Sequence, residues 1–182
     1  MRKTRNRVAD LIDLVHEGGA WDLAMLQDLA ERAARATLAH LDLPAAEYEI
    51  ALLACDDARI AALNAQFRAK PVPTNVLSWP AWDMSAEADG DLPDLPPEGD
   101  PDDPESLGNI ALAYETCTRE AREQDKTLPA HLLHLVVHSV LHLLGYNHIR
   151  DKDAALMEET EIAILATLGV QNPYELGADM PL

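Results

Sequence analysis

The stretch from 138 to 148 reads HSVLHLLGYNH and constrains the fold more than any other part of this 182-residue chain. His138 and His142 are four residues apart, so on a helix their rings lie on one face, close enough to share an ion. Gly145 suits the left-handed backbone with which many helices end. A chain that turns back there brings His148 toward the other two. The stretch therefore predicts a long helix, a glycine turn and a metal site.

The histidine spacing also indicates which side chains bind the metal. His131 and His134 continue the stripe toward the start of the helix. His134 and His142 are eight residues apart, or about 12 Å at 1.5 Å per residue, whereas Zn–N bonds are about 2.1 Å. We therefore expect His138, His142 and His148 to hold one zinc ion, with His131 and His134 in hydrogen-bonded support. Three ligands and an open fourth position are typical of catalytic zinc sites.

The residue after the first histidine argues against one class of enzyme. Zinc proteases carry HExxHxxGxxH, in which the glutamate moves a proton from the attacking water to the leaving amine. This chain has Ser139 there, and a serine hydroxyl needs its own base to do this near neutral pH. Phosphodiester cleavage instead needs a cation beside the charge that gathers on phosphorus. Arginine meets that need through its bidentate fork, and the segment 63–80, LNAQFRAKPVPTNVLSWP, supplies Arg68 as a candidate.

Length and composition fit a single domain over residues 1–182, with 48% hydrophobic residues. The apolar runs are too short or too interrupted to cross a bilayer. Asp10 and Asp13 break any apolar core of a secretory signal, so we expect a cytoplasmic protein with no membrane partner. The two cysteines, Cys55 and Cys117, are expected to be buried thiols rather than a disulfide framework.

The net charge of −18 argues against nucleic-acid binding through a general electrostatic field. Segment 83–106 holds ten acids, five of the twelve prolines and no lysine or arginine, so the rest of the chain carries −8. Such a segment buries too little apolar surface to order itself, and we expect an acidic, proline-rich loop that is mobile and dispensable for folding. A charged recognition tail is the alternative. Most basic residues gather in short groups elsewhere, which allows a local basic surface.

Hydrophobic periodicity and turn residues predict strands alternating with helices at first, and mainly helices in the second half. Asp56 or Asp57 should cap the second helix, Asp151 or Asp153 should cap the last, and Gly169 should end it. This pattern predicts a small α+β domain. The expected strands are 10–16, 48–55, 76–79 and 107–114, and the expected helices are 21–41, 56–67, 115–126, 128–144 and 151–168.

Four segments carry a more specific signature, in this order: FRAKPVPTNVLSWP, LGNIALAYE, HSVLHLLGYNH and MEETEIAILATLGVQNPYE. Over about residues 48–175 they resemble the YbeY family of bacterial endoribonucleases. The resemblance implies an α+β fold with a mixed four-stranded sheet, about five helices, and one zinc ion held by three histidines. The family's ligand motif falls on His138, His142 and His148, and its catalytic arginine falls on Arg68.

The resemblance implies a zinc-dependent, single-strand-specific endoribonuclease of 16S ribosomal RNA maturation and ribosome quality control. Its partners would be single-stranded ribosomal RNA and the ribosome or small-subunit assembly factors. Two alternatives stay open: a metal-dependent hydrolase of a non-RNA substrate, and a non-catalytic ribosome-assembly factor with a structural zinc.

Three positions depart from the common family pattern. Ser139 stands in place of a glycine, and Asn109 and Asn147 stand in place of aspartates. Each asparagine removes a negative charge that could support the histidines or a helix cap. The aromatic residues near these motifs are expected to pack rather than to stack on bases; they are Trp79, Trp82 and Tyr146.

Overall fold

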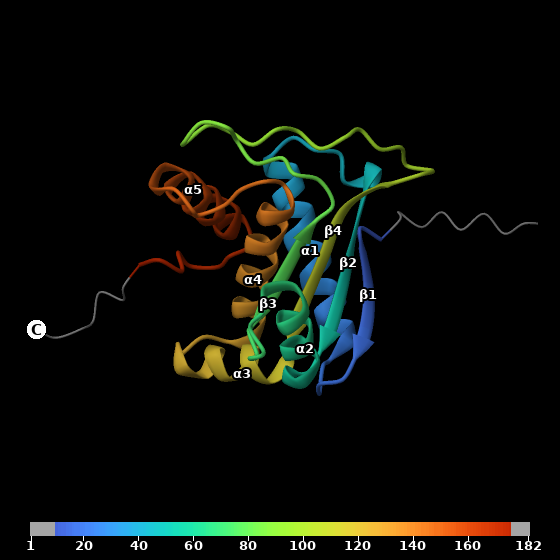
Figure 1. Cartoon of the computed structure of the whole chain (residues 1–182), viewed down its shortest axis with the longest axis vertical. Helices are drawn as coiled ribbons and strands as arrows, with labels where there is room; N and C mark the ends of the chain where they lie inside the picture. Colours follow the sequence, from blue (N-terminus) through green and yellow to red (C-terminus); the bar gives the residue numbers. More distant parts are fainter. Residues whose placement is uncertain (1–9, 176–182) are drawn as a thin grey trace, which may run out of the picture.

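A mixed four-stranded sheet forms the centre of the computed structural model, which describes residues 10–175 (Figure 1). Its strands lie in the order β1-β2-β4-β3. Strand β2 pairs parallel with β1 and with β4, and β3 pairs antiparallel with β4 at one edge. The α+β fold with a mixed four-stranded sheet is therefore confirmed. The strands are β1 (Ile12–Glu17), β2 (Tyr48–Cys55), β3 (Val76–Pro80) and β4 (Glu105–Ala113).

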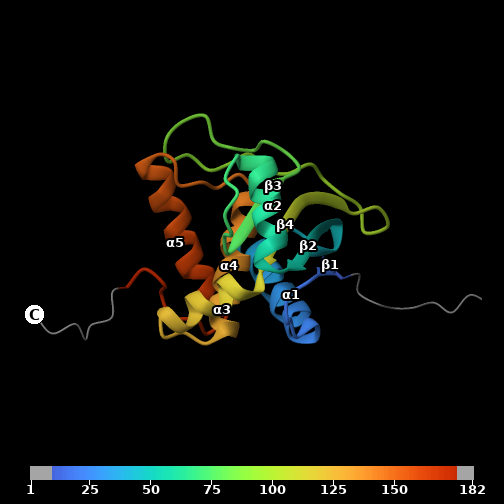
Figure 2. The same ribbon diagram turned by 60° about the horizontal axis from the view of Figure 1, so that its bottom comes forward.

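The helices cover the two faces of the sheet unequally. Alternate residues of β2 divide between a large core shared with α1, α4 and α5 and a small core closed by α2. In Figure 2, α4 lies between α1 and α5, and ten of its 16 residues are buried. This explains why most residues of α4 outside the histidine stripe are apolar. The helices are α1 (Leu23–His40), a 3₁₀ turn (Ala45–Glu47), α2 (Asp57–Arg68), α3 (Tyr114–Glu123), α4 (Leu128–Leu143) and α5 (Asp151–Thr167).

The caps confirm one prediction and correct another. Asp56 is the N-cap of α2, where its side chain accepts the amide N–H of Arg59 at 2.8 Å. The N-cap of α5 is Arg150, and Asp151 and Asp153 lie in the first turn. Asp153 does not cap because its carboxylate accepts hydrogen bonds from the Arg150 guanidinium and from the Gly90 amide. A tertiary contact therefore outweighs the local capping preference.

Two smaller predictions concern burial and membranes. Cys55 and Cys117 are buried free thiols, as predicted, and burial raises the pKa of each to about 12. Both thiols are therefore unreactive at neutral pH. Within residues 10–175, no helix combines the length and the apolar character that a membrane span requires.

The acidic segment 83–106 is irregular up to β4, as predicted, but it is not wholly outside the core. The side chain of Met84 is only 3% exposed and packs in the large core. The Arg150 guanidinium donates to the carbonyls of Ala86 and Glu87, which ties this stretch to the start of α5. The expectation that prolines and acids exclude burial is therefore wrong at Met84. The mobility of the rest, including Leu95 at 77% exposure, stays a prediction.

Replacing Met84 with alanine is expected to lower the free energy of unfolding by about 2–5 kcal/mol, because a cavity replaces a buried side chain. For a chain of this size the melting temperature should fall by about 4–20 °C. Leu95→Ala, in the same segment but exposed, is the matched control and should stay within about 0.5 kcal/mol. Equal melting temperatures for the two variants would show that the segment adds nothing to the core.

Candidate metal centre and adjoining pocket

Three histidine side chains come together at the C-terminal end of α4. His138 and His142 project from the same face of the helix, and their Nε2 atoms are 2.9 Å apart. His148 follows the helix, and its ring stacks beside that of His138 with the ring centres 5.7 Å apart. One ring nitrogen from each residue lies within 4.8 Å of the others, a grouping that can hold a metal ion.

The turn that returns His148 to the helix depends on Gly145. Its backbone has φ +90°, the left-handed region that favours glycine. The amide of Gly145 donates to the carbonyl of His142, and the amide of Tyr146 donates to that of Leu141, which together form a Schellman motif. A Cβ at position 145 would also lie 2.6 Å from the carbonyl oxygen of Met84. The glycine is therefore required by backbone conformation and by close packing.

Hydrogen bonds define which nitrogen of each helical histidine faces the cluster. His138 Nδ1 lies 2.8 Å from Glu161 Oε1, and His142 Nδ1 lies 2.9 Å from the carbonyl oxygen of Tyr146. Both partners only accept, so both Nδ1 atoms donate a proton to them and the two Nε2 atoms face each other. Two Nε2 atoms 2.9 Å apart need either a proton or a metal ion between them. The donor set therefore fits a zinc ion.

The charge states agree with this arrangement. Burial and the neighbouring His138 lower the pKa of His142 to about 4, so its ring is neutral at pH 7. Glu161 has no exposed surface. Burial raises the pKa of Glu161, but its hydrogen bonds with His134 and His138 outweigh burial and lower the pKa to about 2. A buried, ionised carboxylate thus accepts the proton of His138 Nδ1 and orients that ring, as carboxylates beside metal-bound histidines commonly do.

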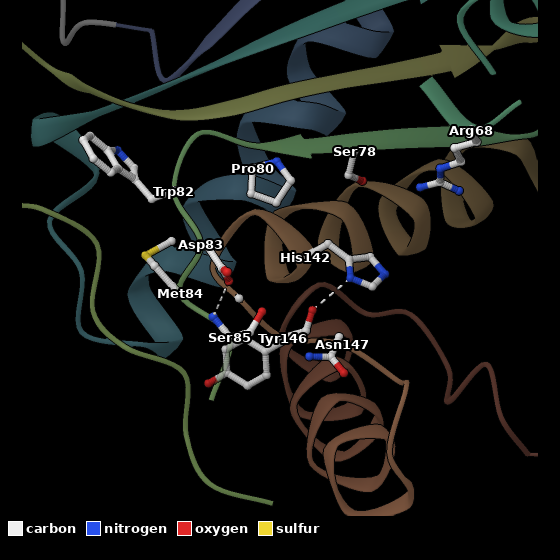
Figure 3. A pocket seen from close by; sticks show the side chains of 11 residues that line it. Arg68, Ser78, Pro80, Trp82, Asp83, Met84, Ser85, His142, Tyr146 and Asn147 are labelled. Carbon is white, nitrogen blue, oxygen red and sulfur yellow. Dashed lines mark hydrogen bonds between the residues drawn. The ribbon is translucent and has the colours of Figure 1, made fainter. Parts of the chain in front are cut away.

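A pocket of about 380 Å³ adjoins the histidine cluster on one side (Figure 3). Its wall combines the end of α2, the edge strand β3, the start of the acidic segment and the turn after α4. Figure 3 shows Trp82 and Arg68 at opposite ends, with His142 on the Arg68 side. The lining residues are Arg68, Ser78, Pro80, Trp82, Asp83, Met84, Ser85, His142, Gly145, Tyr146 and Asn147.

Arg68 is the cationic group of this pocket. It is the last residue of α2 and is exposed, and it has no ion pair or hydrogen bond with any residue in the described range 10–175. It does not cap its own helix, because the amides of Ala69 and Lys70 bond to the carbonyls of Ala65 and Asn64. Its guanidinium is therefore available to a ligand, unlike that of Arg150.

A family model described as Endoribonuclease YbeY matches residues 15–169. The chain belongs to the YbeY family. A relative from Dinoroseobacter shibae is 55% identical over 164 residues, which cover 90% of each chain. A relative from Cereibacter sphaeroides is 54% identical, and the alignment covers 90% of this chain and 98% of the relative. One from Bartonella quintana is 42% identical, and the alignment covers 90% of this chain and 96% of the relative. All three are named Endoribonuclease YbeY.

A solved structure supports the fold of this YbeY-family chain. The solution structure of TM1509 from Thermotoga maritima aligns with a TM-score of 0.50 at 19% identity. The alignment covers 93% of this chain and the whole of the other. At this identity the likeness concerns the fold alone.

The positions that depart from the YbeY pattern have separate local roles. Ser139 is fully buried and lines neither cavity beside the histidines, so it leaves access to the site open and cannot act as a base there. Asn147 lines the pocket, and its side-chain oxygen accepts the amide of Ile149 at 3.1 Å. An amide oxygen can thus replace a carboxylate in this turn. Asn109 is exposed on β4.

The sequence also predicted supporting roles for two other histidines and packing roles for nearby aromatic residues. His134 Nε2 lies 3.4 Å from Glu161 Oε1 and so supports the cluster, whereas His131, near the start of α4, bonds to Glu120 of α3. Tyr146 is buried, as expected. Trp82 is 46% exposed at the pocket rim, and the expectation that it packs rather than stacks on a base stays a prediction. Its indole N–H donates to the Glu105 carboxylate at 3.1 Å, which holds the ring beside the pocket.

Proposed function

We propose that this YbeY-family chain is a zinc-dependent endoribonuclease that cleaves single-stranded RNA. Its role would be 16S ribosomal RNA maturation and ribosome quality control in the cytoplasm, with residues 1–182 acting as one domain. The observation that carries the proposal is that the three-histidine cluster and the unpaired Arg68 adjoin one pocket. The relatives' names support the choice of RNA as substrate.

The residues of the site would divide the work of phosphodiester cleavage. A zinc ion held by His138, His142 and His148 would supply a Lewis acid and lower the pKa of a bound water. Arg68 would donate two parallel N–H bonds to the phosphoryl oxygens as negative charge develops there. Glu161 would keep His138 in its Nδ1–H form.

The electrostatics of the chain support action on RNA that partner proteins present. A net charge of −18 gives little general attraction to phosphates. Arg68 and Lys70 form a small exposed basic lip, whereas Arg32, Arg59 and Arg119 pair with acids. Contact with the RNA would then be local, and the ribosome or small-subunit assembly factors would bring it to the pocket.

The arrangement favours a catalytic over a structural metal. His148 is exposed, and the described cluster comprises three histidines beside a pocket, as in catalytic zinc sites. A structural site would enclose the ion with four protein ligands.

The substrate class is tested by incubating the zinc-loaded chain with three matched molecules: a single-stranded 16S ribosomal RNA fragment, the same RNA as a duplex, and single-stranded DNA of the same sequence. Cleavage is expected for the single-stranded RNA alone. Equal cleavage of the duplex would contradict strand specificity. No cleavage of any RNA by a fully loaded chain would favour a hydrolase of another substrate.

A further inference from the structure

A buried carboxylate links the histidine cluster to the segment that follows α5. Glu161 Oε1 takes a hydrogen bond from His138 Nδ1 at 2.8 Å, while Oε2 takes one from the hydroxyl of Tyr174. Tyr174 lies thirteen positions later in the chain, beyond the end of α5. The carboxylate is therefore held on one side by the long histidine helix and on the other by the C-terminal tail.

The Tyr174 hydroxyl satisfies one oxygen of this buried carboxylate. A buried carboxylate is costly unless both oxygens are hydrogen-bonded, and Glu161 is fully buried. Burial, together with the adjacent Glu161, raises the pKa of Tyr174, so its hydroxyl keeps its proton and can only donate to this partner. The ring also meets His134 edge-on, with centres 5.9 Å apart, and the Tyr174 amide donates to Asn172 Oδ1 at 2.9 Å.

The surroundings give Glu161 room to move if this contact is lost. A second cavity, of about 250 Å³, adjoins His138, His148, Glu161 and Tyr174. Without the hydroxyl, the free oxygen can turn toward this cavity and toward water. Such a rotation would lengthen the hydrogen bond between Glu161 and His138 Nδ1. The His138 ring could then turn, and its Nε2 atom would no longer be held facing the cluster.

We propose that Tyr174 is a positioning residue of the metal centre, which acts through Glu161 to hold His138 with its Nε2 atom directed into the cluster. The tail at 170–175 is thereby a structural part of the site. This inference goes beyond the proposed nuclease activity but rests on the proposed metal site.

The test is a double-mutant cycle in zinc affinity, measured by competition with a chromophoric chelator on the full chain. Tyr174→Phe keeps the ring against His134 and removes only the hydroxyl, and it should weaken zinc binding about tenfold. Glu161→Gln should weaken it about 10–100-fold, the usual loss for partners of metal-bound histidines. The double variant should bind zinc no more weakly than Glu161→Gln alone, because Tyr174 acts through that side chain.

Two controls separate positioning from folding. Tyr114→Phe is the matched change, since Tyr114 packs against Trp21 at the start of α3, away from the cluster, and it should leave zinc affinity unaltered. The melting temperature of each zinc-free variant reports stability without the metal. Unchanged zinc affinity in Tyr174→Phe, or fully additive losses in the double variant, would overturn the inference while leaving the metal site intact. A wild-type chain that does not bind zinc would overturn both.

Discussion

Replacing His148 with alanine is expected to remove most of the bound zinc and, with it, RNA cleavage. His138 and His142 alone offer two nitrogens from one helix face, which is an incomplete site for an ion that prefers four ligands. The loss of zinc affinity should exceed the about 10–100-fold effect of removing an outer partner. Elemental analysis of the purified chain measures the effect directly, with about one zinc per wild-type chain as the reference.

The fold should survive this substitution, because His148 is exposed and lies in the loop between α4 and α5. The zinc-free forms of wild type and His148→Ala should therefore melt at similar temperatures. His40→Ala is the control, since His40 is exposed at the end of α1, and it should keep its zinc. Undiminished stoichiometric zinc in His148→Ala would remove His148 from the ligand set.

Arg68→Ala is expected to slow RNA cleavage by about a hundredfold to a thousandfold, which corresponds to about 2.7–4 kcal/mol of transition-state stabilisation. The reason is that Arg68 lines the pocket beside His142 and pairs with no acid among residues 10–175. Arg68→Lys should recover little, because an ammonium group is a point charge without the two parallel donors of guanidinium. The measurement is the cleavage rate of a single-stranded ribosomal RNA fragment at saturating zinc.

Zinc content and melting temperature should not change in the Arg68 variants, since Arg68 contacts neither the histidines nor an acid among the described residues. Arg32→Ala is the matched control, because Arg32 forms only an exposed pair with Asp28 on α1. Near wild-type rates in both Arg68 variants would exclude its electrophilic role. Loss of zinc or unfolding would instead make Arg68 a structural residue.

Local sequence signals predicted most of the fold because they concern neighbours along the chain. The periodicity of α1 and α4, the cap at Asp56 and the left-handed turn at Gly145 depend on residues within one or two helical turns. The same holds for the meeting of His138, His142 and His148, which one helix and one turn determine. The metal itself and the role of Arg68 remain predictions.

The sequence did not identify the residues whose roles depend on distant partners. Glu158, Glu159 and Glu161 look alike in sequence, and only the packing of α5 against α4 buries the last of them beside His138. The segment MEETEIAILATLGVQNPYE, which carries part of the family resemblance, contains both Glu161 and Tyr174, but no local pattern in it singles out either residue. Met84 was missed because an acidic, proline-rich context predicts exposure.

One metal ion at the histidine cluster is expected to drive cleavage of single-stranded RNA. The decisive measurement is to strip the wild-type chain with a chelator, add zinc in fractions of an equivalent, and follow cleavage of a single-stranded ribosomal RNA fragment. We expect no cleavage without zinc and a rate that rises to a plateau at about one equivalent per chain. A stripped, folded chain that cleaves at the full rate, or a chain that binds one zinc and leaves the RNA intact, would contradict it.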